Sequence, residues 1–169
     1  MEAAKIVLLS TAAATVYGIV HCLTSAHLCV EYFTVLPSNP YATSSPLALG
    51  LVWGIVGFWW VGFLLGLWVA VAARCGGRPP RTARSLIQPL AKHFILTGIF
   101  AVLSGIVGYA YGFVGFVRLL PHLVNQLEFS RHADLIACLW SHRVAYLFQF
   151  VGATVLMVVI WRSRREKIA

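Results

Sequence analysis

The sequence predicts an all-α integral membrane protein, a bundle of four transmembrane helices. Of its 169 residues, 60% are apolar and 11% are charged, and the mean hydropathy is +0.83. Soluble domains are about 45–50% apolar and about 25% charged. So few charged side chains cannot cover the surface of a soluble globule, which excludes a soluble enzyme, a disordered chain and a disulfide-rich secreted domain.

Four apolar stretches, the first three of them uncharged, are long enough to cross a bilayer, because about 20 helical residues span about 30 Å of hydrocarbon. They cover about residues 6–30, 47–73, 94–117 and 135–161. Helices are expected rather than barrel strands, since the apolar runs are continuous and do not alternate with polar residues. We therefore expect one transmembrane domain over residues 1–169.

The first stretch loosely resembles a cleavable signal peptide. Lys5 precedes an apolar run that contains the small residues Ala12 to Ala14. However, the apolar run continues to Val30, and cleavage would leave the two termini on opposite sides. We expect this segment to be retained as the first helix.

Small residues recur at every fourth position in the second and third stretches. Such spacing lets helices approach closely in a bilayer. It predicts that these two helices pack against each other or against a partner chain. The positions are Gly50, Gly54, Gly62 and Gly66 in the second stretch, and Ser104, Gly108 and Gly112 in the third.

A short amphipathic helix is expected between the third and fourth stretches. Apolar residues recur there at helical spacing after Arg118, with Pro121 near the start. A helix with one apolar face lies in the plane of the membrane interface. The residues of the apolar face are Leu119, Leu120, Leu123, Val124 and Leu127.

The basic residues predict the orientation. Ten lysines and arginines fall at the two termini and in the loop after the second stretch, whereas three fall on the other side, at Arg118, Arg131 and Arg143. Basic residues favour the cytoplasmic side, so both termini are expected in the cytoplasm. This basic face should attract anionic lipids. No nucleic-acid binding is expected, because no soluble domain carries the charge.

Polar and ionisable residues concentrate at the outer ends of the first and fourth helices. Such groups are costly at membrane depth and often mark functional sites. The main candidates are Tyr17, His21, Cys22, His27, Cys29 and Glu31 in the first helix, and Asp134, Cys138, His142 and Arg143 in the fourth.

Helical spacing predicts some of the contacts within this region. His27 and Glu31 are four residues apart, so one continuous helix would place them on one face. His21 and His27 would point about 120° apart. Arg143 is a candidate to pair with Glu31 across the helices. Cys29 and Cys138 either form a disulfide or remain buried free thiols.

Three interpretations of the cluster remain open. It is a hydrogen-bonded network that fixes helix register, or it holds a tetrapyrrole, or it binds a metal ion. Haem or (bacterio)chlorophyll would use His21, His27 or His142 as axial ligand. A Zn or Cu ion would use His27, Glu31, Cys138 and His142. The sequence contains no compact metal-binding motif such as Cys-x-x-Cys.

Several short motifs resemble a family of small, uncharacterised bacterial four-helix integral membrane proteins. They are Tyr17-Gly-x-x-His21, Cys29-x-Glu31-Tyr32-Phe33-Thr34, Trp53-Gly54 and Trp59-Trp60. The resemblance covers most of the chain. It implies a multi-pass protein of the bacterial cytoplasmic (inner) membrane and carries no activity.

These observations predict a non-catalytic membrane subunit. Such a subunit would pack on other membrane proteins or on a second copy, as in energy-transducing complexes, with a pigment or haem as candidate cofactor. The small size, the glycine-rich helices and the lack of a catalytic motif favour this interpretation. The alternative is a small metal-dependent or redox enzyme that uses the outer His/Glu/Cys cluster.

Overall fold

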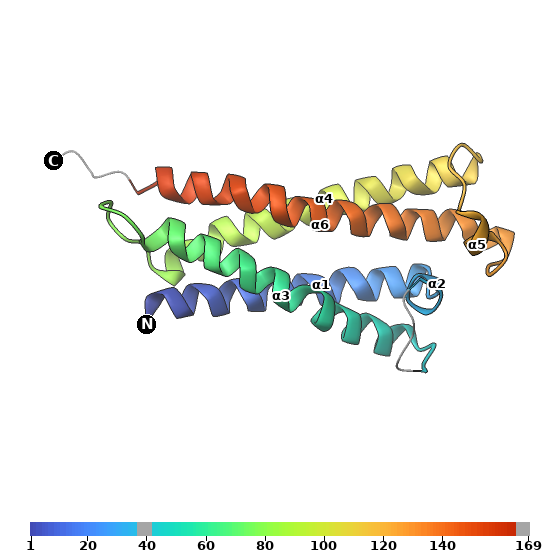
Figure 1. Ribbon diagram of the computed structural model, residues 1–169, viewed down its shortest axis with the longest axis horizontal. Helices are drawn as coiled ribbons and strands as arrows, with labels where there is room; N and C mark the ends of the chain where they lie inside the picture. Colours follow the sequence, from blue (N-terminus) through green and yellow to red (C-terminus); the bar gives the residue numbers. More distant parts are fainter. Residues whose placement is uncertain (37–41, 165–169) are drawn as a thin grey trace.

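A computed structural model describes residues 1–36 and 42–164, and four long helices dominate it (Figure 1). They are α1 (Glu2–Leu28), α3 (Pro46–Arg74), α4 (Ala83–Phe113) and α6 (His132–Arg162). Each is long and apolar enough to cross a membrane. The expectation of an all-helical protein with four helices long and apolar enough to span a membrane is therefore confirmed.

The long helices pack as two pairs, α1 with α3 and α4 with α6 (Figure 1). The prediction that the glycine-rich second and third helices pack on each other is therefore wrong. The α3 glycines face α1 instead, where a Cβ on Gly54 would lie 2.5 Å from the Cα of Ile19. The α4 glycines face α6, where a Cβ on Gly108 would lie 3.0 Å from the Cγ of Trp140.

Helix α4 starts at Ala83, well before the expected residue 94, and runs through Pro89. Proline has no N–H to donate to the carbonyl four residues earlier. Here that carbonyl belongs to Ser85, and the Arg81 guanidinium donates to it at 2.9 Å. The hydrogen bond from Arg81 replaces the one that Pro89 cannot make.

Helix α1 ends at Leu28, and a separate turn of helix, α2 (Glu31–Thr34), follows. Cys29 lies between them with an extended backbone, at φ −151° and ψ 89°. The expectation that His27 and Glu31 share one face of a continuous helix is therefore wrong. Arg131 stabilises the break, because its Nη2 donates to the free Leu28 carbonyl at 2.8 Å.

The segment between α4 and α6 contains only short helical turns. These are α5 (Pro121–Val124) and the 3-10 turn η1 (Phe129–Arg131). The expected interfacial helix is thus a single turn. Leu119 and Leu123 are buried against the bundle. Leu120 is exposed, so the apolar face is narrower than the sequence suggested.

Arg164 joins the loop between α3 and α4 to the end of α6. Its side chain is buried and donates to four backbone carbonyls at 2.6–2.9 Å. Two of these acceptors, Ala72 and Cys75, lie at the C-terminal end of α3. A guanidinium is well placed there, since helix C-termini carry free carbonyls and partial negative charge. The start of α1 lies at this same end of the bundle (Figure 1).

Candidate functional site

The candidate polar residues lie at the other end of the bundle, where α1, α2, α3 and α6 meet. His142 of α6 is at the centre and is 5% exposed. Its ring stacks on that of Tyr32 from α2, with centroids 4.2 Å apart, and contacts that of His21 from α1 at 4.3 Å. The fold thus brings together two of the three candidate histidines.

Both nitrogens of His142 have partners within the chain. Nδ1 lies 3.0 Å from the carbonyl of Cys138, one turn earlier, so Nδ1 carries the proton and donates it. Nε2 is then an acceptor and faces the Sγ of Cys22 at 3.9 Å. The lone pair of Nε2 faces the thiol across a long contact, so only a weak interaction engages it.

His21 differs from His142, because its Nε2 is buried and lacks a hydrogen-bond partner among the described residues. Its ring stacks on Tyr17 at 5.7 Å, and the Tyr17 hydroxyl likewise lacks a partner in the described part of the chain. Unpaired buried polar atoms are uncommon and call for an explanation. Among the described residues, His132 Nε2 is also buried without a partner, but of these two histidines it is His21 that contacts the ring of His142.

His27 lies outside this cluster. It is exposed on α1, and its Nδ1 donates to the carbonyl of Leu23 at 2.8 Å. The expected metal ligands His27, Glu31, Cys138 and His142 are thus divided between the surface and the interior. Within residues 1–36 and 42–164, no three His, Cys, Asp or Glu side chains form a group able to hold a metal ion.

Glu31 pairs with Arg131, and the expectation that it pairs with Arg143 is wrong. Two nitrogens of Arg131 bind its carboxylate at 3.1 and 3.2 Å, and a third binds Asp134. Arg143 follows the inward-facing His142 and is turned to the exposed side of α6. The hydrogen bond from Arg131 holds the pKa of Glu31 below its ordinary value.

The three cysteines of this region are buried free thiols. The Cys29 thiol donates to Glu31 at 3.3 Å, and the Cys138 thiol donates to the carbonyl of Ser25 at 3.8 Å. Contact with the Cys138 thiol and burial raise the pKa of Cys29. A thiol with a raised pKa is a poor nucleophile, so Cys29 acts here as a packed, weakly hydrogen-bonding group.

A cavity of about 400 Å³ lies beside the cluster, between α1, α4 and α6. Its lining includes Tyr17 and His21 on one side and the α4 glycines Gly98 and Gly105 on another. The volume is in the range of small-molecule sites, which is about 300–1,000 Å³. The position of this cavity, with Tyr17 and His21 in its wall, was not predicted.

Tyr32 and Arg131 contribute to the site in ways that the sequence did not predict. Tyr32 covers His142, and Arg131 connects α1, α2 and α6. The signal for Arg131 was present, because it precedes Asp134 by three residues at the start of a helix. Tyr32 gave no signal of its own, since its position depends on the break after Leu28.

Comparison of the chain with family models, with characterised proteins and with solved structures gave no match. The resemblance to small bacterial membrane proteins therefore stays a prediction.

Proposed function

We propose that this protein is a non-catalytic subunit of a membrane complex in the bacterial cytoplasmic membrane, with both termini in the cytoplasm. Energy-transducing complexes are the class of assembly in which such small subunits are expected. The observation that carries the proposal is an aromatic surface on α3. We call Trp59, Trp60 and Phe63 the α3 aromatic face.

The α3 aromatic face points away from the other helices. Trp59 is 50% exposed, Trp60 38% and Phe63 43%. Both tryptophans lie at the middle of α3, which runs from Pro46 to Arg74. The middle of a spanning helix lies at the centre of the hydrocarbon, whereas tryptophan prefers the membrane interfaces.

The indole N–H groups strengthen this argument. Within the described residues, neither Trp59 nor Trp60 has a hydrogen-bond acceptor. Hydrocarbon offers none, and a buried donor without a partner costs about 1–3 kcal/mol. A helix of a partner subunit can supply acceptors and a surface for aromatic packing, and large aromatic side chains are enriched in protein interfaces.

The polar cluster supports a non-catalytic role. His142 is 5% exposed and its Nδ1 donates to a carbonyl, and the cysteines are buried. A general base needs a free lone pair within reach of a substrate. The arrangement fits a network that fixes the positions of α1, α2 and α6.

Native gel electrophoresis of membranes solubilised in a mild detergent tests the subunit proposal. We expect the wild-type chain in an assembly that contains other polypeptides, and we expect Trp59→Ala/Trp60→Ala to shift it to the mass of the free chain. The matched control is Ile99→Ala/Ile106→Ala, which truncates two exposed apolar residues of α4. Wild-type protein that migrates alone, or with copies of itself only, contradicts the proposal.

The cavity between α1, α4 and α6 favours a second candidate function, retention of a lipid-soluble cofactor. His21 lines this cavity and its Nε2 has no partner among the described residues, so haem or a (bacterio)chlorophyll would bind through His21. The purified protein would then show a Soret or chlorophyll band that His21→Ala removes and His27→Ala retains. A spectrum without either band contradicts the tetrapyrrole candidate and leaves the subunit proposal untouched.

A further inference from the structure

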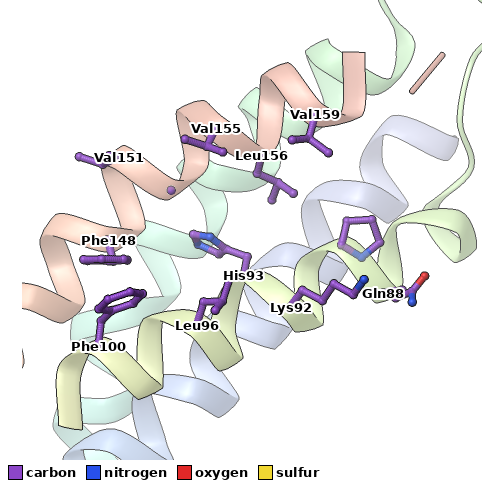
Figure 2. A pocket seen from close by; sticks show the side chains of 12 residues that line it. Gln88, Lys92, His93, Leu96, Phe100, Phe148, Val151, Val155, Leu156 and Val159 are labelled. Atoms are coloured by element: carbon purple, nitrogen blue, oxygen red, sulfur yellow. The ribbon is translucent and has the colours of Figure 1, made fainter. Parts of the chain in front are cut away.

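We propose that a groove between α4 and α6 binds an anionic phospholipid from the leaflet at the end of the bundle where α1 begins. The groove has a volume of about 410 Å³ and faces outward from the helix pair (Figure 2). It lies at the opposite end of the bundle from the polar cluster. The proposal is independent of the subunit proposal, which rests on α3.

The groove exists because α4 and α6 pack tightly over only part of their length. Toward α5, glycines bring the two backbones together, and a Cβ on Gly105 would lie 3.4 Å from the carbonyl oxygen of Ala137. Toward the start of α4, the ring of His93 packs against Gly152 of α6 and its Nε2 lies 3.1 Å from the Oε1 of Gln149, and the groove opens beside this contact. Phe100 and Phe148 stack at 4.5 Å and close the groove at its inner end (Figure 2).

The walls of the groove fit an acyl chain. Leu96 of α4 faces Val151 and Val155 of α6 across it (Figure 2). Lys92 and Phe100 are eight positions apart, which corresponds to about 12 Å along the helix. The groove is therefore a narrow apolar channel that runs from a charged mouth to an aromatic floor.

The mouth of the groove carries an unpaired positive charge. Lys92 and Gln88 line it (Figure 2). Arg84 precedes Gln88 by four residues and so lies on the same face of α4. Among the described residues, no carboxylate pairs with Lys92 or Arg84. A phosphate supplies the missing negative charge, and basic pockets between spanning helices are typical sites for anionic lipid headgroups.

A protein helix fits this groove less well than a lipid. The positive charge lies at one end and needs an anion there, whereas the remaining lining is apolar except for Gln88 and His93. A phospholipid has this combination in one molecule, and the long Lys92 side chain can extend toward the headgroup level. The sequence predicts that the whole basic face attracts anionic lipids, and the groove assigns one binding site on that face.

Native mass spectrometry of the full-length protein tests the site. The protein is extracted in detergent, delipidated, and mixed with phosphatidylglycerol or phosphatidylcholine. We expect preferential retention of one phosphatidylglycerol, and we expect Lys92→Gln to weaken it about fivefold, the effect of one lysine near a lipid surface. Lys5→Gln is the matched control, because Lys5 lies at the same end and is paired with Glu2.

A second pair of variants tests the acyl channel. Val155→Trp fills the groove, whereas Val158→Trp adds the same bulk to an exposed residue of α6 that does not line it. We expect only Val155→Trp to abolish retention. The proposal is overturned if the two lipids are retained equally, or if either variant behaves like its matched control. Equal lipid retention by the Val155→Trp and Val158→Trp variants would indicate a non-specific lipid layer or a different occupant of the groove.

Discussion

Arg131 makes more side-chain contacts between separate elements than the sequence suggested. It lies at the start of α6 and binds Glu31 of α2, Asp134 of α6 and the last carbonyl of α1. Its role depends on the break after Leu28, which frees that carbonyl. Arg131 thus joins the end of α1 to the starts of α2 and α6, and these contacts help to enclose His21 and His142.

The ion pair between Glu31 and Arg131 predicts a pH-dependent stability. Because the folded-state pKa of Glu31 lies below its ordinary value of 4.5, the stabilisation is present above pH 4.5 and is lost as pH falls through the folded-state pKa. Glu31→Gln should lower the free energy of unfolding by about 1 kcal/mol at pH 7. It should also reduce the loss of stability on acidification.

Thermal melts in detergent between pH 3 and pH 7, about one melt per pH unit, would measure this pH dependence. Glu128→Gln, in an exposed loop, serves as control. A wild-type and a Glu31→Gln protein with parallel pH profiles would rule the explanation out.

Arg164 predicts a large local effect at the other end of the molecule. Arg164→Ala leaves four backbone carbonyls without their donor, so we expect a loss of about 3 kcal/mol of unfolding free energy. Arg162→Ala, at an exposed position two residues earlier, should change it by less than about 0.5 kcal/mol. Denaturant titration in mild detergent measures both. Similar effects of the two substitutions would mean that the Arg164 contacts do not stabilise the loop.

At the scale of the helix, the glycines of α3 determine how closely it approaches α1. A Cβ on Gly54 would lie 2.5 Å from the Cα of Ile19, and backbone atoms cannot move aside easily. Gly54→Ala should therefore destabilise the protein by about 1–3 kcal/mol through overpacking. At Gly98 the nearest atom is 3.6 Å away, so Gly98→Ala should be neutral or stabilising. Unfolding in SDS compares the two variants, and an equal response would contradict tight packing at Gly54.

The helices could be predicted from the sequence, whereas their pairing could not. Uninterrupted apolar runs fix the existence of α1, α3, α4 and α6, because hydrocarbon tolerates only hydrogen-bonded backbone. Glycine spacing showed that α3 has a close-packing face but not which helix meets it. The start of α4 was missed because its first turns contain Arg84, Pro89 and Lys92. Only the position of Arg81 shows how the helix tolerates Pro89.

The sequence predicted only part of the candidate site, because it does not show how the helices are rotated against each other. Its region and two of its residues, His21 and His142, follow from polar side chains at membrane depth. The contact of the two rings depends on how α1 and α6 are rotated, and this is not written in the spacing of either helix. The prediction that His27 and Glu31 share a face failed because the helix breaks at Cys29, between them. The prediction that Arg143 pairs with Glu31 failed because Arg143, one residue after His142, is rotated to the exposed side of α6.

For the molecule as a whole, the predicted orientation can be tested with a native cysteine. Cys75 is exposed at the end of α3, whereas Cys22, Cys29 and Cys138 are buried. If both termini are cytoplasmic, a membrane-impermeant maleimide should label Cys75 in inverted vesicles and not in spheroplasts. The variant Cys75→Ser should abolish labelling in both preparations. Labelling in intact spheroplasts would reverse the proposed orientation.

The most direct test of the subunit proposal asks what covers the α3 aromatic face in native membranes. A photo-reactive benzoylphenylalanine is introduced at Phe63, and at Ile106 of α4 as a control. We predict a discrete cross-link from position 63 to a polypeptide other than this chain, and its loss when Trp59→Ala and Trp60→Ala are added. Adducts to lipid only, or the same adduct from both positions, would contradict the account.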